Sequence, residues 1–401
     1  MTLRGIAKLR LTLVFWLAST ATGLVTGCSP LPCRWEDPAC SSVNLFLLIR
    51  SLPGPYQDVV LAVNGGANRV LINQGNRTFT VGPDLEPSRV EPSLDVDLGD
   101  INGDGILDLY VANDGAQPVV HLGNGDGSFQ DAASNVGTPS NNSTTVELAD
   151  FNGDGNLDAV VANNGAAPEV YYPGQGTAIF GTSNAVDAGT TTAGEDLVVA
   201  DFDRNGTLDI YSAHNGNDVY YSGNGNGTFQ PGVALDVSNA AFGATAGDFN
   251  GDAILDVVIA LDSAALFRIA LSNGAGGFTF SDGPGTGFAQ HDAVAGDFND
   301  DGFLDVFLVG TGANPEMVYL GNGDGTFQLP LIADPATTQD CREAAVGYLD
   351  GDRHLDVFVG CTAGVPSLIY FGKGDGTFDP PVTTPISDSA DGMALGDLNG
   401  W

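Results

Sequence analysis

The chain has 401 residues, of which 13 are basic and 50 are acidic, so its formal net charge is −37. This charge excludes nucleic acid as a partner and direct docking of the folded body on an anionic bilayer, because like charges repel. Hydrophobic residues make up 43% of the chain, enough to bury a core, which excludes an acidic disordered tail. The length suits two or three ordinary domains or one large all-β domain, and the acidity leaves polycation-rich partners, neutral partners or metal cations.

The first residues predict an export signal. Three basic residues precede a short apolar run, Leu11–Ala18, which is shorter than the ~20 residues of a membrane span. The stretch Leu24–Cys28 resembles the lipobox of bacterial lipoproteins, in which the chain is cut before a cysteine that then carries lipid. The resemblance implies a signal peptide over residues 1–27, lipidation at Cys28 and a membrane-anchored lipoprotein at the bacterial cell envelope or surface. In the alternative, Cys28 is incidental and the protein is secreted.

The cysteines agree with export. The chain has five of them, and an odd number leaves one without a disulfide partner. If Cys28 carries lipid, Cys33 and Cys40 can close a small loop, and Cys341 and Cys361 can meet across two antiparallel strands. Both disulfides are hypotheses, and both need the oxidising conditions found outside the cytoplasm.

One motif recurs through the rest of the sequence after a linker at residues 28–43. The nine residues Asp100–Asp108 (DINGDGILD) have full or partial copies that begin at residues 100, 150, 201, 248, 297, 348 and 397, a period of roughly 49 residues. A turn that ends in phenylalanine, such as GNGDGSF at Gly123–Phe129, keeps the same period. Residues 44–401 are therefore predicted to form one repetitive domain. The predicted repeats are about 44–93, 94–143, 144–194, 195–241, 242–290, 291–342 and 343–391, followed by a closing or truncated strand at 392–401.

Each repeat predicts about four β-strands. A short alternating run such as Leu94–Leu98 precedes the Asp-rich loop, and an apolar run such as Leu109–Ala112 follows it. A third run ends in an Asn-Gly or Asp-Gly turn, whose glycine takes the positive φ of a tight hairpin. A four-strand repeat of this length is typical of a β-propeller blade. We therefore predict an all-β fold, a seven-bladed β-propeller of four-stranded blades with calcium loops, with a solenoid as the alternative.

The two ends of the repeat region leave ring closure open. The first repeat has lost its Asp-rich loop, and only Asp58 matches the final aspartate. The last strand, Gly392–Asp397, can pair with the opposite end and close the ring, replacing or supplementing the weak first strand at Leu45–Arg50. Alternatively, the chain stops at Trp401 inside a loop motif and is a fragment.

The nine-residue loop has the oxygen pattern of a calcium site. Side-chain oxygens stand at positions 1, 3, 5 and 9, a glycine at position 6 allows a sharp turn, and the backbone carbonyl at position 7 can point inward. Calcium takes six to eight such oxygens, and we expect Ca²⁺ at about five sites. The predicted ligands are Asp100, Asn102, Asp104, Ile106 and Asp108; Asp150, Asn152, Asp154, Asn156 and Asp158; Asp201, Asp203, Asn205, Thr207 and Asp209; Asp248, Asn250, Asp252, Ile254 and Asp256; and Asp297, Asn299, Asp301, Phe303 and Asp305.

Two loops depart from this pattern. The fourth has Ala253 at position 6, which predicts a strained turn, but we still expect calcium to bind there. The sixth has Tyr348 at position 1 and Arg353 at position 6. We expect no calcium in the sixth loop, and Arg353 is predicted to stand in for the ion.

These repeats resemble the FG-GAP/VCBS repeats of integrin α-chain β-propellers and of many bacterial surface proteins. The family pattern, Gly-Asp-Phe-Asn followed by Leu-Asp and an apolar run, is present at Gly247–Asn250 and Gly296–Asn299. The resemblance covers residues 44–400. It implies a seven-bladed propeller whose loops bind calcium between the first two strands of a blade and present a surface for recognition.

The sequence has no catalytic constellation. The histidines show no zinc spacing, and each is expected to be a satisfied strand or loop residue: His121, His214, His291 and His354. We therefore predict a calcium-binding recognition or adhesion module for a protein or glycan ligand, a monomer that contacts a membrane only through the lipid at Cys28. The alternatives are a polysaccharide lyase or hydrolase, acting at the central channel or in deviating loops, and a purely structural envelope protein.

Overall fold

The computed structural model describes residues 56–85, 92–130, 134–136, 142–164, 167–187, 193–235, 240–262, 267–285, 288–312, 314–334, 339–362 and 364–399. The predictions for the export signal, for Cys28 and for a Cys33–Cys40 disulfide lie outside these residues. Within the described part of the chain, no helix is long and apolar enough to cross a membrane.

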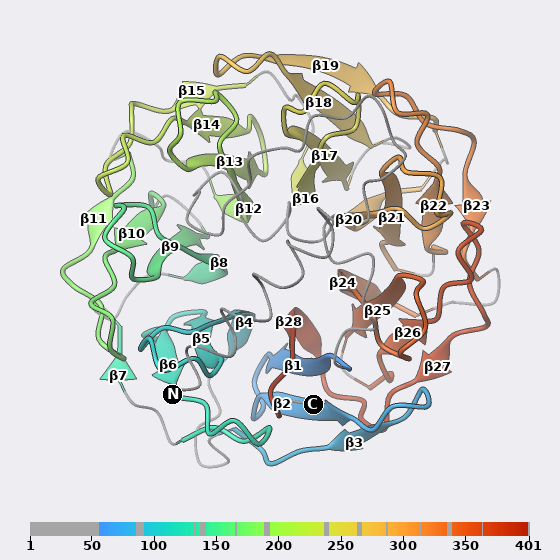
Figure 1. Cartoon of the computed structure of the whole chain (residues 1–401), viewed down its shortest axis with the longest axis horizontal. Helices are drawn as coiled ribbons and strands as arrows, with labels where there is room; N and C mark the ends of the chain where they lie inside the picture. Colours follow the sequence, from blue (N-terminus) through green and yellow to red (C-terminus); the bar gives the residue numbers. More distant parts are fainter. Residues whose placement is uncertain are drawn as a thin grey trace, which may run out of the picture.

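The described residues form seven four-stranded antiparallel sheets, which stand as blades around a central axis (Figure 1). The all-β, seven-bladed propeller predicted from the repeats is confirmed. From the innermost to the outermost strand, blade 1 is β28 (Ala390–Gly396), β1 (Asp58–Val63), β2 (Arg69–Asn73) and β3 (Phe79–Val81). Blade 2 is β4 (Ser93–Gly99), β5 (Asp108–Asn113), β6 (Val119–His121) and β7 (Ser134–Asn135). Blade 3 is β8 (Ser143–Ala149), β9 (Asp158–Asn163), β10 (Val170–Tyr172) and β11 (Asn184–Ala185).

The other four blades repeat this order. Blade 4 is β12 (Gly194–Ala200), β13 (Asp209–His214), β14 (Val219–Tyr221) and β15 (Val233–Ala234). Blade 5 is β16 (Ala241–Gly247), β17 (Asp256–Leu261), β18 (Arg268–Ser272) and β19 (Phe278–Asp282). Blade 6 is β20 (Gln290–Gly296), β21 (Asp305–Gly310), β22 (Met317–Tyr319) and β23 (Leu331–Ile332). Blade 7 is β24 (Cys341–Gly347), β25 (Asp356–Cys361), β26 (Leu368–Tyr370) and β27 (Val382–Thr383).

Blade 1 is built from both ends of the described chain. Its innermost strand β28 pairs antiparallel with β1, from Asp58 opposite Gly396 to Val63 opposite Ala390. This pairing covers the edge that β1 would otherwise expose, so the ring closes through main-chain hydrogen bonds. The weak strand predicted at Leu45–Arg50 lies outside the described residues.

The hydrophobic core lies between adjacent blades. All six residues of the second strand are buried in every blade, because both faces of each sheet pack against a neighbour. One cluster joins Tyr110 of blade 2 to Val161 and Phe180 of blade 3, and the Tyr110 and Phe180 rings meet edge to face. The recurring phenylalanine of each turn therefore fills the space between two blades.

The innermost strands separate the two faces of the ring. Each of them ends directly before the Asp-rich loop, as β4 ends at Gly99 before Asp100. The loops therefore share one face, and the first residues of the innermost strands lie at the other end of the seven-residue strands, roughly 20 Å away.

Candidate cation loops and channel mouth

Five Asp-rich loops connect the innermost and second strands of blades 2 to 6, and all five close on the same hydrogen bonds. The position-6 N–H donates to the position-1 carboxylate, as Gly155 does to Oδ2 of Asp150 at 2.8 Å. The position-3 oxygen accepts from the position-5 N–H, and the position-5 oxygen accepts from the position-7 N–H. Each loop therefore turns its oxygen-bearing side chains back onto its own backbone.

Position 6 has a positive φ in all five loops, between 63° and 97°. Four of these residues are glycines and the fifth is Ala253, whose φ is 63°. The strained turn predicted at Ala253 is therefore present, since a residue with a Cβ rarely adopts this conformation. The Ala253 N–H still donates to Oδ2 of Asp248 at 2.9 Å, so this loop keeps the shape of the others.

The position-9 aspartates are buried and have a second role. In blade 6, Oδ2 of Asp305 accepts from the Phe298 N–H at 2.9 Å, and Oδ1 accepts from the Gly321 N–H at 2.8 Å. Asp58 does the same in blade 1, where its partners are Asn73 and Leu398. This aspartate links the loop to the turn after the third strand, which explains why it persists in blade 1 without the rest of the motif.

Burial raises the pKa of these position-9 carboxyls. The pKa of Asp158 rises to about 6 and that of Asp305 to about 7, because the loss of solvent around each group outweighs the hydrogen bonds that favour its ionised form. Nearby loop carboxylates, such as Asp154 for Asp158, add to the effect. A cation beside these groups would favour ionisation and reverse the shift.

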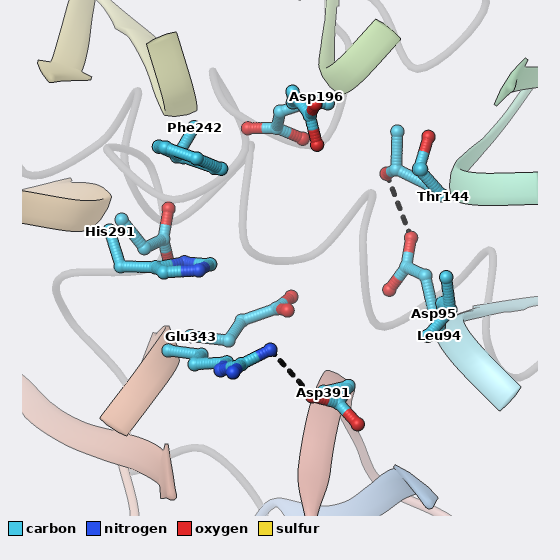
Figure 2. Close-up of a pocket in the computed structure, with 12 residues that line it drawn as sticks. Leu94, Asp95, Thr144, Asp196, Phe242, His291, Glu343 and Asp391 are labelled. Carbon is cyan, nitrogen blue, oxygen red and sulfur yellow. Dashed lines mark hydrogen bonds and ion pairs between the residues drawn. The ribbon is translucent and has the colours of Figure 1, made fainter. Parts of the chain in front are cut away.

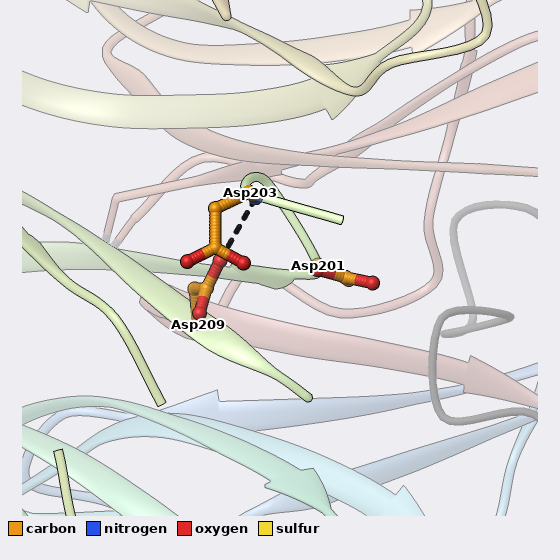
Figure 3. Close-up of side chains that lie close together, drawn as sticks. All are labelled: Asp201, Asp203 and Asp209. Carbon is orange, nitrogen blue, oxygen red and sulfur yellow. Dashed lines mark hydrogen bonds between the residues drawn. The ribbon is translucent and has the colours of Figure 1, made fainter. Parts of the chain in front are cut away.

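In the loop of blade 4, the carboxylate oxygens converge closely enough to share one ion. Asp201, Asp203 and Asp209 each offer a carboxylate oxygen, and these atoms lie within 4.8 Å of one another (Figure 3). In the first loop, Oδ1 of Asp100 is buried and accepts no hydrogen bond from the described part of the chain. A buried oxygen without a donor is costly, and the donor set is the type that Ca²⁺ takes. The residues present therefore fit the predicted ion.

The Tyr348 loop of blade 7 differs from the five. Arg353 at its position 6 is exposed, and its role in place of the ion stays a prediction. The guanidinium that reaches this loop belongs to Arg77 of blade 1, whose Nε lies 2.8 Å from Oδ2 of Asp350. Asp350, Asp352 and Asp356 also bring carboxylate oxygens within 4.8 Å of one another.

The opposite face has a polar cavity of about 210 Å³ at the ring centre, which we call the channel mouth (Figure 2). All seven innermost strands contribute to it through their second residue. These seven equivalent residues are Leu94, Thr144, Glu195, Phe242, His291, Arg342 and Asp391. No two of them are the same amino acid, whereas the loops on the other face repeat one motif. The rings of Phe242 and His291 are stacked, with centroids 5.1 Å apart.

Polar side chains from the next strand position of five blades also line the cavity. Oδ2 of Asp196 accepts from the Ala244 N–H of blade 5, and Oδ2 of Asp292 accepts from the Ala344 N–H of blade 7, both at 2.8 Å. Asp95 receives the Thr145 hydroxyl and the Val146 N–H in the same way (Figure 2). These carboxylates accept hydrogen bonds from the innermost strand of the next blade, and they give the cavity an acidic lining.

Burial and mutual repulsion favour the protonated form of the carboxyl groups that line this cavity. Burial, with the neighbouring Asp292, raises the pKa of Asp196 to about 7, and burial raises the pKa of Glu343 well above its usual value. Burial, with the nearby Arg342 charge, lowers the pKa of His291, so its imidazole is neutral at pH 7. Nη1 of Arg342 lies 3.5 Å from Oδ1 of Asp391. At neutral pH the cavity therefore offers both hydrogen-bond donors and acceptors.

All four histidines are satisfied strand or loop residues as expected, and the fourth, His291, bonds to the Arg342 backbone. Nε2 of His214 lies 3.0 Å from Glu169, Nδ1 of His354 lies 2.9 Å from Asp300, and Nδ1 of His121 lies 3.2 Å from a carbonyl oxygen. His291 lines the channel mouth. The sequence contained a signal for this site, because the second residue of the innermost strand is the position where the repeats all differ.

Comparison with known proteins identifies the repeats. The sequence matches the FG-GAP-like repeat over residues 56–111, 100–161, 150–212, 201–259, 248–308 and 297–359. This chain belongs to the FG-GAP-like repeat family. No curated protein sequence matches it.

Several solved structures share the fold of this FG-GAP-like repeat protein at low identity. A lectin of Agrocybe aegerita, described as recognising non-reducing terminal N-acetylglucosamine, is 20% identical, with 86% of this chain and 96% of the lectin covered and a TM-score of 0.61. The periplasmic gluconolactonase PpgL of Pseudomonas aeruginosa is 12% identical over 85% of this chain and 99% of its own, with a TM-score of 0.61. The BP39L lectin of Burkholderia pseudomallei is 18% identical over 82% and 96%, with a TM-score of 0.57. These likenesses show the propeller fold alone.

Proposed function

We propose that this protein is a calcium-stabilised recognition module that binds a carbohydrate at the channel mouth. One observation carries the proposal: the seven equivalent rim positions hold seven different side chains around one cavity. Structural residues in a repeat protein recur from blade to blade, so a ring that does not repeat is best explained by one asymmetric ligand.

The chemistry of the rim favours a sugar. The half-buried Phe242, stacked on His291, supplies a flat apolar surface for a pyranose ring, and the carboxyl groups and Arg342 can hydrogen-bond hydroxyl groups. The cavity of about 210 Å³ is smaller than the roughly 300–1,000 Å³ of pockets for drug-sized ligands, so it suits one sugar residue or a chain end. Two proteins with this fold are described as lectins, one of them as recognising N-acetylglucosamine, which is consistent with the proposal.

The acidic lining also selects by charge. Asp196 and Asp292 lie around the cavity, and even partly protonated they would repel a uronate or a sulfated sugar. The ligand class that fits is therefore a neutral or amino sugar.

Glycan-array binding followed by calorimetry with the best hit tests this proposal. Phe242→Ala should weaken binding at least tenfold, because it removes the stacking surface. Leu329→Ala is the matched control, since Leu329 is 79% exposed and lies outside the channel mouth. Equal affinity for the wild type and Phe242→Ala, or binding only to a protein ligand, would show that the channel mouth is not a sugar site.

We propose that calcium fills the five loops of blades 2 to 6 and stabilises the fold that holds this cavity. The buried Oδ1 of Asp100, which has no hydrogen-bond donor, supports this proposal, as do the convergent oxygens of Asp201, Asp203 and Asp209. Titration calorimetry on chelator-treated protein should give about five calcium ions per chain. Free calcium at 100 times the dissociation constant would stabilise the folded protein by about 2.7 kcal/mol for each site. An unchanged melting temperature after chelation would contradict the proposal.

We further propose export and anchoring through a lipid at Cys28, with the molecule otherwise a monomer. The support is the basic, apolar and Leu24–Cys28 order of the first residues. The intact mass of the mature protein tests this: it should begin at Cys28 with a lipid mass, and Cys28→Ala should release the protein into the soluble fraction. Cleavage at another residue, without added mass, would indicate ordinary secretion.

A glycoside hydrolase is the second candidate function. It is favoured by the paired carboxyls of the channel mouth, since such enzymes need one protonated and one ionised carboxyl group. Asp196, whose pKa is about 7, suits either state at neutral pH. Release of reducing ends from a bound oligosaccharide, abolished by Asp196→Asn, would favour the enzyme. Binding without turnover would favour the recognition module.

A further inference from the structure

Arg77 stands at a position that glycine occupies in most blades. It lies in the turn between the third and outermost strands of blade 1, and the corresponding residues of the other blades are Gly127, Ala178, Gly227, Gly276, Gly325 and Gly376. The five glycines have φ values between 73° and 84°, and Arg77 has a φ of 62°. A side chain makes this conformation unfavourable, so an arginine here needs a compensating interaction.

The compensating interactions lie on blade 7. Nε of Arg77 is 2.8 Å from Oδ2 of Asp350, and its Nη1 is 2.5 Å from Oδ2 of Asp379. The guanidinium also lies over the ring of Phe371, 4.6 Å from its centroid. The Asp350 side chain is only 6% exposed, so its charge needs a close partner.

Asp350 belongs to the Tyr348 loop, which lacks two features of the five Asp-rich loops. In the five intact loops, the position-6 N–H donates to a carboxylate at position 1. The Tyr348 loop has no carboxylate at position 1, and its position-6 residue, Arg353, does not have a positive φ. Asp350, Asp352 and Asp356 still bring carboxylate oxygens within 4.8 Å of one another, so this loop needs a nearby positive charge.

Other residues of blade 1 hold the same loop. The Asn73 side-chain amide donates to the Leu349 carbonyl oxygen at 2.7 Å, and the Tyr348 N–H donates to Oε1 of Gln57 at 3.1 Å. The ring of Tyr56 packs on Gly351, where a Cβ would come within 2.6 Å of it. These contacts join the seventh blade to the first, in which the β28–β1 pairing closes the ring.

We propose that the Arg77 guanidinium takes the place of calcium at the Tyr348 loop, so that the junction between blades 7 and 1 is held without the ion. The other cation loops depend on calcium, and this one carries its own cation on a neighbouring blade. Blade 7 also contains the Cys341–Cys361 disulfide, which ties its innermost strand to its second strand. The junction itself is held by the Arg77 ion pairs and the hydrogen bonds from blade 1, so removal of calcium leaves it in place. The inference rests on the calcium sites proposed above only for this contrast between loops.

Hydrogen exchange of the full chain, with calcium and with chelator, tests the contrast. Chelation should speed exchange at the five intact loops and leave residues 348–356 and 73–79 unchanged. Equal loss of protection at residues 348–356 would overturn the proposal. If no loop responds to chelation, the calcium proposal fails, and the role of Arg77 is then decided by the variants alone.

The variant Arg77→Gly gives a test of sign. It restores the residue found in five other blades and relieves the backbone strain, so strain alone predicts a more stable protein. Loss of the Arg77 ion pairs with blade 7 predicts the opposite result. The melting temperature should fall, and hydrogen exchange at residues 348–356 should be at least about fivefold faster with or without calcium. Arg268→Gln, which removes an ion pair within blade 5, is the control and should leave residues 348–356 unchanged. A neutral or stabilised Arg77→Gly variant would overturn the proposal.

A rescue experiment separates charge neutralisation from simple packing. The triple variant Arg77→Gly, Tyr348→Asp, Arg353→Gly rebuilds the full loop motif without the guanidinium. It should bind one calcium ion more than the wild type and regain protection at residues 348–356 only when calcium is present. Calcium binding without restored protection would show that Arg77 acts through packing rather than in place of the ion.

Discussion

The substitution of tyrosine by phenylalanine should have opposite effects on the free energy of unfolding at equivalent positions of two blades. Tyr110 of blade 2 and Tyr211 of blade 4 are both fully buried, and each meets a phenylalanine edge to face, at 5.4 and 5.6 Å between centroids. The Tyr211 hydroxyl donates to Oδ2 of Asp218 at 2.7 Å. Among the described residues the Tyr110 hydroxyl has no hydrogen-bond partner, because Pro118 stands where blade 4 has Asp218. The aromatic packing is matched, so only the hydroxyl differs.

The magnitudes follow from this difference. Tyr211→Phe loses a hydrogen bond to a charged group and should lower the free energy of unfolding by about 1.5–3 kcal/mol. Tyr110→Phe removes a buried hydroxyl that costs about 1–3 kcal/mol of desolvation, so it should raise that free energy by about 1 kcal/mol or more. Urea unfolding at fixed calcium and pH, followed by far-ultraviolet circular dichroism, measures both free energies. Destabilisation by Tyr110→Phe, or a neutral Tyr211→Phe, would refute the reasoning.

Three further predictions concern pH, the disulfide and calcium. The pKa of Asp196 is raised to about 7 by burial, so above pH 4 the folded state keeps a proton that the unfolded chain has lost. The free energy of unfolding should therefore fall as pH rises from about 4 to 8, and it should fall less steeply in Asp196→Asn. Parallel slopes for the two proteins would be inconsistent with this prediction. Removing the Cys341–Cys361 disulfide, which closes a separation of 20 residues, should cost about 3 kcal/mol in urea unfolding, and a loss below about 1 kcal/mol would contradict it. Asp301→Asn at the exposed position 5 should reduce stability only with calcium present and change it by less than about 0.5 kcal/mol in chelator.

Local patterns in the sequence predicted the blades. Alternating and apolar runs specify strands, and Asn-Gly or Asp-Gly turns specify hairpins, so each repeat encodes its own four-stranded sheet. The disulfide between Cys341 and Cys361 was predicted for the same reason, since the two residues flank one hairpin, and it is present. The spacing of the loop oxygens was equally local, and the five intact loops fold alike. The strain at Ala253 followed from a single residue.

Contacts between distant residues depended on the ring. Arg77 and Asp350 are 273 positions apart in sequence, so no local pattern could favour Arg77 over Arg353 as the neighbour of that loop. Asp58 completes its bonds only through Leu398, at the other end of the described chain. The channel mouth takes one residue from each of seven strands, and only a closed ring brings Phe242, His291 and Arg342 around one cavity. The sequence by itself determined the repeating unit and its number, because short-range turn and strand preferences encode them. The tertiary structure decided which singular residues meet, because closure of the ring sets those distances.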